Sequence, residues 1–235
     1  MLIIVSLYRY PLPYSYISMN QQKIIDQTAT FIKEQLSGES SGHDWWHVYR
    51  VWKSAVRIGK QEQADLFVVE LAALLHDIAD WKFHDGNDEV GPQRAAEWLQ
   101  TLQVDANIIA HICQIIRDIS FKGAGVTTTM HSIEGKVVQD ADRLDAIGAI
   151  GIARTFAYGG SKGREMYNPD VSPLLHDSFE AYKQNQSHTI NHFYEKLLLL
   201  KERMNTATAR QLAEQRHRVM EEYLDQFYRE WEGEA

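Results

Sequence analysis

An adjacent histidine and aspartate, His76 and Asp77, stand at the end of an almost entirely apolar segment. The preceding residues, 68–75, read VVELAALL, so hardly any face of a helix here is polar and we expect the segment to be buried. A buried carboxylate costs free energy unless it is paired or binds a cation. The position therefore predicts either a satisfied polar pair at a helix end or a metal site.

Three further His-Asp dipeptides have simpler structural explanations. Asp44, in the sequence GHDWW, is expected to cap the N-terminus of the next helix. His84 and Asp85 fall in the sequence FHDGND, which is typical of a turn. Asp177 follows SPLLH near an expected helix start, where an acidic residue suits the helix dipole. Only His76 and Asp77 call for a chemical explanation.

Two other apolar helices carry ionisable groups. His47 and Arg50 are three residues apart in the sequence HVYR and should share a helix face. The later sequence QDADRLDAIGAIGIART places Asp140, Asp142 and Asp145 among isoleucine, alanine and glycine. Asp142 and Asp145 share a face of that helix, whereas Asp140 points elsewhere. Three acids in so apolar a helix are hard to explain as a solvated surface.

These residues resemble the pattern of the HD-domain metal-dependent phosphohydrolases, in which a histidine is followed by an adjacent His-Asp pair and then by a distant aspartate. The matching residues here are His47, His76, Asp77 and Asp142. The resemblance covers about residues 44–156, and QDADRLDAIGAIGIARTF resembles the stand-alone bacterial branch called YedJ-like. It implies an all-α, single-domain helical HD fold. It also implies hydrolysis of a phosphoester or phosphoanhydride bond in a small nucleotide-like substrate.

The four matching residues would form a mixed nitrogen and oxygen ligand set. Two imidazoles and two carboxylates suit Mn²⁺, Fe²⁺, Mg²⁺, Co²⁺ or Ni²⁺ in octahedral geometry and leave two positions for water or substrate. Such an ion would neutralise both aspartates and activate water. The extra-ligand motifs of two-metal HD proteins are not evident before Asp142, so we expect one ion. The histidines in that interval are His84, His111 and His131.

Three residues near the ligands are candidates for a catalytic role. Arg50 and Arg143 could clamp a phosphate through paired hydrogen bonds, although a salt bridge to a nearby carboxylate explains each equally well. Asp80, three residues after Asp77, could act as a general base or orient a ligand. Four other cations in or near glycine-containing loops are more simply solvated: Lys82, Lys122, Lys162 and Arg164.

The elements that position these residues are predicted to be helices. Apolar residues recur at three- and four-residue steps from Met19 onward, and no segment alternates like a half-buried strand. Residues 1–18, rich in tyrosine and proline, are expected to form an irregular arm before one HD-type domain over 19–235. The expected helices cover about 19–36, 44–60, 64–81, 89–102, 105–119, 132–159, 172–201 and 203–231.

The helix expected over 132–159 decides which cations can reach the substrate. A continuous helix of about 25 residues would carry Lys162 and Arg164 roughly 35–40 Å from its start. That distance excludes them from the phosphate site unless the helix breaks at Gly148 or Gly151, two glycines whose spacing weakens a helix. We therefore favour Arg50 and Arg143 as the clamp.

Composition limits the class of protein. A chain of 235 residues, 44% apolar, can form one core without a second domain, and a net charge of −8 without a long basic block argues against a nucleic-acid polymer as partner. The apolar stretch 2–7 is far shorter than the roughly 20 residues of a membrane span, and no basic leader precedes it. The single cysteine, Cys113, fits a reducing cytoplasm. Apolar and aromatic residues at helical spacing in 197–231 predict core packing or a homodimer face.

Two other functions are compatible with the sequence. An HD-fold iron oxygenase would need a di-iron ligand set, and the missing extra ligands count against it. A non-catalytic helical protein could bind a nucleotide or a partner and keep the metal for stability. Tight binding without turnover would identify that protein.

Overall fold

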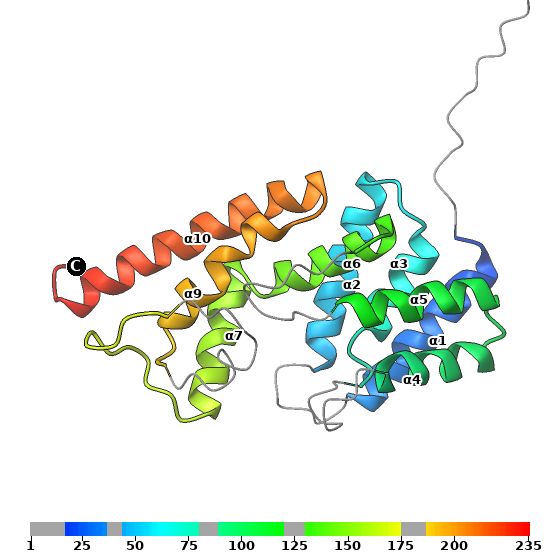
Figure 1. The fold of residues 1–235 in the computed structure, drawn as a ribbon, viewed down its shortest axis with the longest axis horizontal. Helices are drawn as coiled ribbons and strands as arrows, with labels where there is room; N and C mark the ends of the chain where they lie inside the picture. Colours follow the sequence, from blue (N-terminus) through cyan, green and yellow to red (C-terminus); the bar gives the residue numbers. More distant parts are fainter. Residues whose placement is uncertain (1–16, 37–43, 80–88, 120–129, 175–186) are drawn as a thin grey trace, which may run out of the picture.

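The computed structural model describes residues 17–36, 44–79, 89–119, 130–174 and 187–235 (Figure 1). These residues form helices and the connections between them, with no strand among them, so the all-α class is confirmed. None of the described helices is both long and apolar enough to cross a bilayer. The α-helices are α1 (Met19–Gln35), α2 (Trp45–Gln61), α3 (Leu66–Leu75), α4 (Val90–Thr101), α5 (Ala106–Ile119), α6 (Ile133–Asp145), α7 (Gly148–Ser161), α9 (Asn191–Glu195) and α10 (Ala207–Trp231). Two short 3₁₀ turns, η2 (Leu197–Leu199) and η3 (Lys201–Arg203), lie between α9 and α10.

Side-chain caps set where the helices begin. Asp44 caps α2 as predicted, because its carboxylate accepts a hydrogen bond of 2.9 Å from the backbone N–H of His47. Ser132 caps α6 in the same way. Ser18 caps α1 at Met19. Residues 1–16 lie outside the described residues, so the arm over 1–18 and the domain over 19–235 stay predictions.

Helix α3 forms the centre of the helical packing. Every residue from Phe67 to Leu75 is buried, and the helix contacts α1, α2, α5 and α6. Its one charged residue, Glu70, accepts a hydrogen bond of 2.7 Å from the indole N–H of Trp52. The end of α3, where His76 follows, therefore lies in the interior between α2 and α6.

The continuous helix expected over 132–159 is wrong, because the chain breaks between α6 and α7. Gly148 has φ +75°, and a Cβ there would lie 2.9 Å from the Cβ of Arg216. At Gly151 a Cβ would collide with the backbone carbonyl of Ala146. Both positions thus require glycine, and α7 turns sharply away from α6 (Figure 1).

The helix expected over 172–201 is also wrong in its described part. Residues 171–174 are not helical, α9 is five residues long, and short 3₁₀ turns follow it. Leu197 and Leu200 are each 2% exposed. Their three-residue spacing suits a 3₁₀ turn, in which residues i and i+3 lie on one side.

Helix α10 is anchored to α6 by Asp140. This carboxylate is fully buried and accepts hydrogen bonds of 2.8 Å from the backbone N–H of both Asn205 and Thr206 and from the Thr206 hydroxyl. Asp140 therefore points away from Asp142, as expected, and fixes the start of α10.

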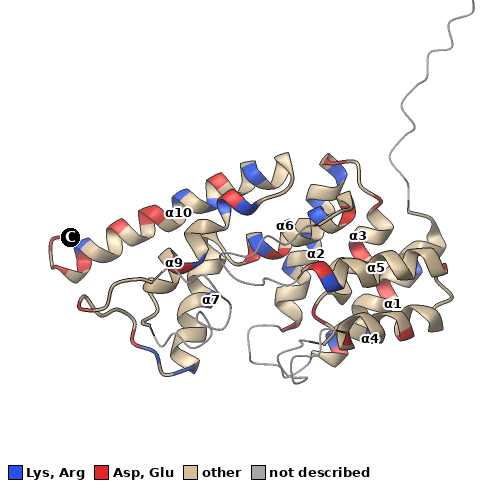
Figure 2. Ribbon diagram, in the orientation of Figure 1, with Lys and Arg blue, Asp and Glu red and all other residues tan. Residues whose placement is uncertain are grey.

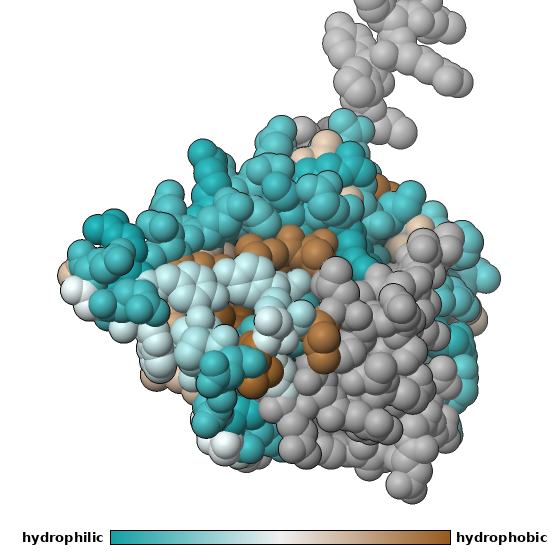
Figure 3. Space-filling view, turned by 60° about the vertical axis from the view of Figure 1, so that its left-hand side comes forward, coloured by the Kyte–Doolittle hydropathy of each residue, from teal (hydrophilic) through white to brown (hydrophobic). Residues whose placement is uncertain are grey.

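Most of the apolar residues expected on α10 pack into the core. Met220 and Leu224 are buried, and Tyr223 and Phe227 pack against them as partly buried residues. The face in Figure 3 nevertheless carries a band of apolar surface bordered by hydrophilic surface. A homodimer through this part of the molecule stays a prediction.

Candidate metal centre

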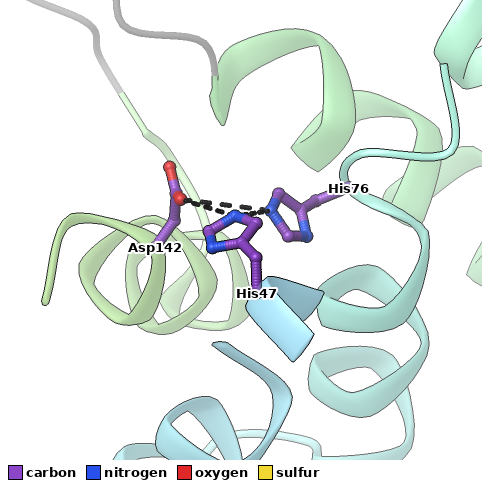
Figure 4. A group of neighbouring side chains, drawn as sticks. All are labelled: His47, His76 and Asp142. Carbon is purple, nitrogen blue, oxygen red and sulfur yellow. Dashed lines mark hydrogen bonds and ion pairs between the residues drawn. The ribbon is translucent and has the colours of Figure 1, made fainter. Parts of the chain in front are cut away.

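Three residues from three parts of the chain converge on one point (Figure 4). His47 lies in the first turn of α2, His76 directly follows α3, and Asp142 lies in the last turn of α6. Each offers one ligand atom, and these atoms all lie within 4.8 Å of one another. The two Nε2 atoms are 3.3 Å apart, and Oδ1 of Asp142 lies 3.5 Å from Nε2 of His47 and 4.0 Å from that of His76.

Asp77 adds a fourth donor to this group. Its Oδ2 lies 3.3 Å from Nε2 of His47 and 3.4 Å from Nε2 of His76. The structure thus brings together all four ligand candidates found in the sequence. The donor set combines two imidazole nitrogens with two carboxylate oxygens, which suits a first-row divalent ion.

Hydrogen bonds on the far side of each ring aim the histidines at the centre. Nδ1 of His76 lies 2.8 Å from the carbonyl oxygen of Ala73, and since a carbonyl only accepts, Nδ1 must carry the proton. Nδ1 of His47 lies 2.8 Å from Oδ2 of Asp145 and donates to that carboxylate. Each ring therefore turns Nε2 toward the centre, the arrangement found around metal-binding histidines.

Asp145 is shared by several donors. Oδ1 accepts a hydrogen bond of 2.7 Å from Nε of Arg50, and Oδ2 accepts 3.0 Å from Nη2 of Arg50 and 2.7 Å from Nη1 of Arg154. Burial alone would raise the pKa of Asp145, but the bonds from His47 and Arg50 and the charge of Arg154 hold it well below its usual range. The carboxylate therefore remains charged.

His47 is basic in the metal-free protein. Burial lowers its pKa, but hydrogen bonds to Asp145 and Asp77 and the charge of Asp142 outweigh burial and raise the pKa to about 9. Without metal, the imidazole is therefore expected to be protonated on both nitrogens, and positively charged, at neutral pH. A positive charge is thus already favoured where the four donor atoms meet, which supports the fit of the site to a cation.

The site opens to solvent on its carboxylate side. The side chains of His47 and His76 are each 2% exposed, whereas that of Asp142 is 37% exposed. Asp142 is therefore the most exposed of the four ligand candidates, since the side chain of Asp77 is 16% exposed.

The proposed catalytic residues occupy different places. Arg50 is held by Asp145, next to His47, with its side chain 31% exposed. Arg143 donates from Nη1 to the backbone carbonyl of Arg203 and so connects α6 to η3. Asp80 lies outside the described residues, as do Lys82 and Lys122.

Where they are described, other cations and histidines singled out in the sequence have neighbours outside the four ligand candidates. Lys162 and Arg164 follow α7 and lie 5.6 and 5.7 Å from the ring centroid of Tyr158. His111 faces Glu134 at 3.8 Å. His84 lies outside the described residues.

Sequence reasoning missed Arg154. It lies on α7, nine residues after Asp145, and reaches that carboxylate only because the chain turns back after α6. The sequence signal for this turn was the pair Gly148 and Gly151, which the sequence identified only as a possible break in the helix.

Comparison with known proteins agrees with this geometry. The family model described as "HD domain" matches residues 45–147, which contain all four ligand candidates. Protein YpgQ of Bacillus subtilis (strain 168) is 42% identical over 216 residues, covering 92% of this chain and 97% of that protein. The chain belongs to the HD-domain family.

Solved structures of HD-family relatives have the same fold. An HD-superfamily hydrolase from Bacillus thuringiensis is 46% identical, with a TM-score of 0.73 over 90% of this chain and 98% of that one. A protein from Lactobacillus plantarum is 40% identical, with a TM-score of 0.77 over 93% and 100%. B. subtilis YpgQ, solved in complex with ADP, is 41% identical, with a TM-score of 0.73 over 90% and 97%. The expected HD fold is thereby confirmed.

Proposed function

We propose that this HD-family protein is a metal-dependent phosphohydrolase that cleaves a phosphoester or phosphoanhydride bond in a small nucleotide-like substrate, as a nucleotide pyrophosphohydrolase or phosphatase. The observation that carries the proposal is the convergence of two oriented imidazole nitrogens and two carboxylate oxygens at a solvent-accessible point. The ADP complex of YpgQ supports a nucleotide as ligand.

His47, His76, Asp77 and Asp142 would hold one divalent ion, with Mn²⁺, Fe²⁺, Mg²⁺, Co²⁺ and Ni²⁺ as candidates. When bound, such an ion supplies Lewis acidity that activates water and stabilises the charge developing on a phosphoryl group. One ion rather than two remains a proposal.

The chain's own residues would bind and orient the phosphate. Arg50 is the first candidate, because Asp145 holds its Nε and Nη2 edge and fixes the partly exposed guanidinium beside His47. Arg143 is the second, and its bond to the Arg203 carbonyl would have to coexist with substrate. Asp80 remains our candidate for a general base.

A substrate screen tests the proposal. The protein loaded with Mn²⁺ is incubated with nucleoside mono-, di- and triphosphates, and release of phosphate and pyrophosphate is measured separately. We expect hydrolysis that stops when a chelator removes the ion and returns when Mn²⁺ is added back. Tight nucleotide binding without turnover across the panel would favour the non-catalytic alternative.

A further inference from the structure

Two arginines from different helices meet on the carboxylate of Asp145. Arg50 comes from α2 and Arg154 from α7, and both donate to Oδ2, the oxygen that also accepts from Nδ1 of His47. Nη1 of Arg154 lies in addition 3.4 Å from the backbone carbonyl of Asp145. One acidic residue thus joins the candidate metal ligand to two guanidinium groups.

The position of Arg154 depends on the break after α6. In an unbroken helix, residues nine positions apart are separated by about 13 Å along the axis. Here the chain turns sharply at Gly148, with φ +75°, and Gly151 lies too close to a backbone carbonyl to carry a side chain. The two glycines bring Arg154 back to Asp145 and hold it beside His47.

Arg154 adds a positive charge beside the candidate metal site. Three carboxylates lie around this site, those of Asp77, Asp142 and Asp145. Arg50 and Arg154 both pair with Asp145, and the charges of Asp44 and Arg216 also act on Arg50 and Asp145. A positive charge held next to the site favours an anionic ligand.

The two arginine side chains are more exposed than that of Asp145. The Asp145 side chain is 4% exposed, whereas those of Arg50 and Arg154 are 31% and 28% exposed. Figure 2 shows basic and acidic residues together where α2 packs on α6. The buried carboxylate thus pairs with two arginine side chains that are both partly exposed.

We propose that Arg154 is a phosphate-binding residue of this site, held beside Arg50 by Asp145. Its ligand is a phosphate or diphosphate group, such as the one a nucleotide would present to the metal. The inference rests on the proposed function and extends it, because it adds Arg154 to the arginines that would bind the phosphate of the substrate. Asp145 then couples anion binding to the orientation of His47 through a single oxygen atom.

Binding of inorganic phosphate to the Mn²⁺-loaded full-length protein tests this inference without requiring turnover. Protein-bound Mn²⁺ broadens the ³¹P resonance of phosphate that binds beside it, and a titration gives the Kd. Arg154→Gln is the main variant, because its amide can still donate to Asp145 while the charge is lost. We expect its phosphate Kd to rise about tenfold or more, the usual effect of losing a charge-assisted hydrogen bond.

Two further variants complete the experiment. Arg154→Lys should recover part of the affinity, and Arg229→Ala, at an exposed position in the last turn of α10, should bind phosphate like the unmodified protein. Mn²⁺ content and melting temperature are measured on each variant to establish that it is folded and loaded.

An unchanged phosphate Kd in loaded Arg154→Gln would overturn the inference and leave Arg154 as a structural tie between α6 and α7. Absence of ³¹P broadening with the unmodified protein would overturn it as well. Binding that depends on Arg154, in a protein that hydrolyses no nucleotide, would support the inference and refute the proposed function. Nucleotide hydrolysis by the unmodified protein, together with an unchanged phosphate Kd in Arg154→Gln, would overturn the inference and support the proposed function.

Discussion

Replacing Asp145 with asparagine should weaken metal binding although Asp145 is not a proposed ligand. The carboxylate is 4% exposed and accepts a bond of 2.8 Å from Nδ1 of His47, which orients the ring and increases its basicity. In Asp145→Asn one oxygen becomes an NH₂ group, which cannot accept a hydrogen bond. The single oxygen that remains cannot accept all the bonds from His47, Arg50 and Arg154 that the two carboxylate oxygens now share.

The expected loss of affinity follows from the role of such partners. Removing the carboxylate behind a metal-binding histidine costs about 10- to 100-fold in metal affinity, or roughly 1.4–2.7 kcal/mol. Calorimetric titration of the metal-free protein with Mn²⁺ measures the change in Kd directly. The ion should still bind, because the four proposed ligands remain.

Asp140→Asn is the matched control. Asp140 lies on the same helix and is equally buried, but its partners are Asn205 and Thr206 at the start of α10. This variant should lose stability toward denaturant while its Mn²⁺ Kd stays close to that of the unmodified protein. Equal Mn²⁺ Kd values for Asp145→Asn and the unmodified protein would refute the reasoning, as would an equally large loss in Asp140→Asn.

Three further predictions concern the same region. Asp142→Asn should reduce nucleotide turnover far more than Asp140→Asn, because only Asp142 faces the centre; equal losses would mean that the wrong carboxylate has been assigned. Because the pKa of His47 is about 9 without metal, Mn²⁺ binding near pH 7.5 should release about one proton, and Mn²⁺ affinity should rise with pH toward 9. Calorimetry in buffers of different ionisation enthalpy measures the proton release. Binding heats that do not depend on the buffer would contradict the prediction. Gly151→Ala should destabilise the protein by about 1–3 kcal/mol, because the new Cβ clashes with a backbone carbonyl. Gly160→Ala, whose Cβ meets nothing within 4 Å, should be neutral or mildly stabilising. Denaturant unfolding of both variants measures the difference.

Local sequence signals drew attention to the region of the candidate ligands, and the resemblance to the HD-domain pattern then selected the ligand set. His76 and Asp77 follow a helix with no polar face, and Asp44 precedes a helix in the manner of a cap. The spacing of Asp142 and Asp145 placed both on one face of α6, and one meets His47 at Nε2 and the other at Nδ1. Local periodicity and residue type gave the helix faces, whereas the choice of Asp142 over Asp145 as a ligand came from the resemblance to the HD-domain pattern.

Contacts that depend on how the chain turns between helices could not be predicted from local sequence patterns. Arg154 reaches Asp145 only through the turn at Gly148, and periodicity does not say whether a glycine bends or ends a helix. The apolar run at Leu197 gave the same pattern as a long helix, yet tertiary packing divides it into 3₁₀ turns. Asp140 looked like a third candidate acid until its partners Asn205 and Thr206, more than sixty residues away, were located.

The most direct test of the proposed metal centre is the metal content and nucleotide turnover of the unmodified protein and of Asp77→Ala, measured on the same preparations. The proposal predicts about one divalent ion per chain in the unmodified protein, as the four converging donors require, and hydrolysis that depends on that ion. Asp77→Ala should retain neither the ion nor the activity. An Asp77→Ala protein that is fully loaded and fully active would contradict the assignment.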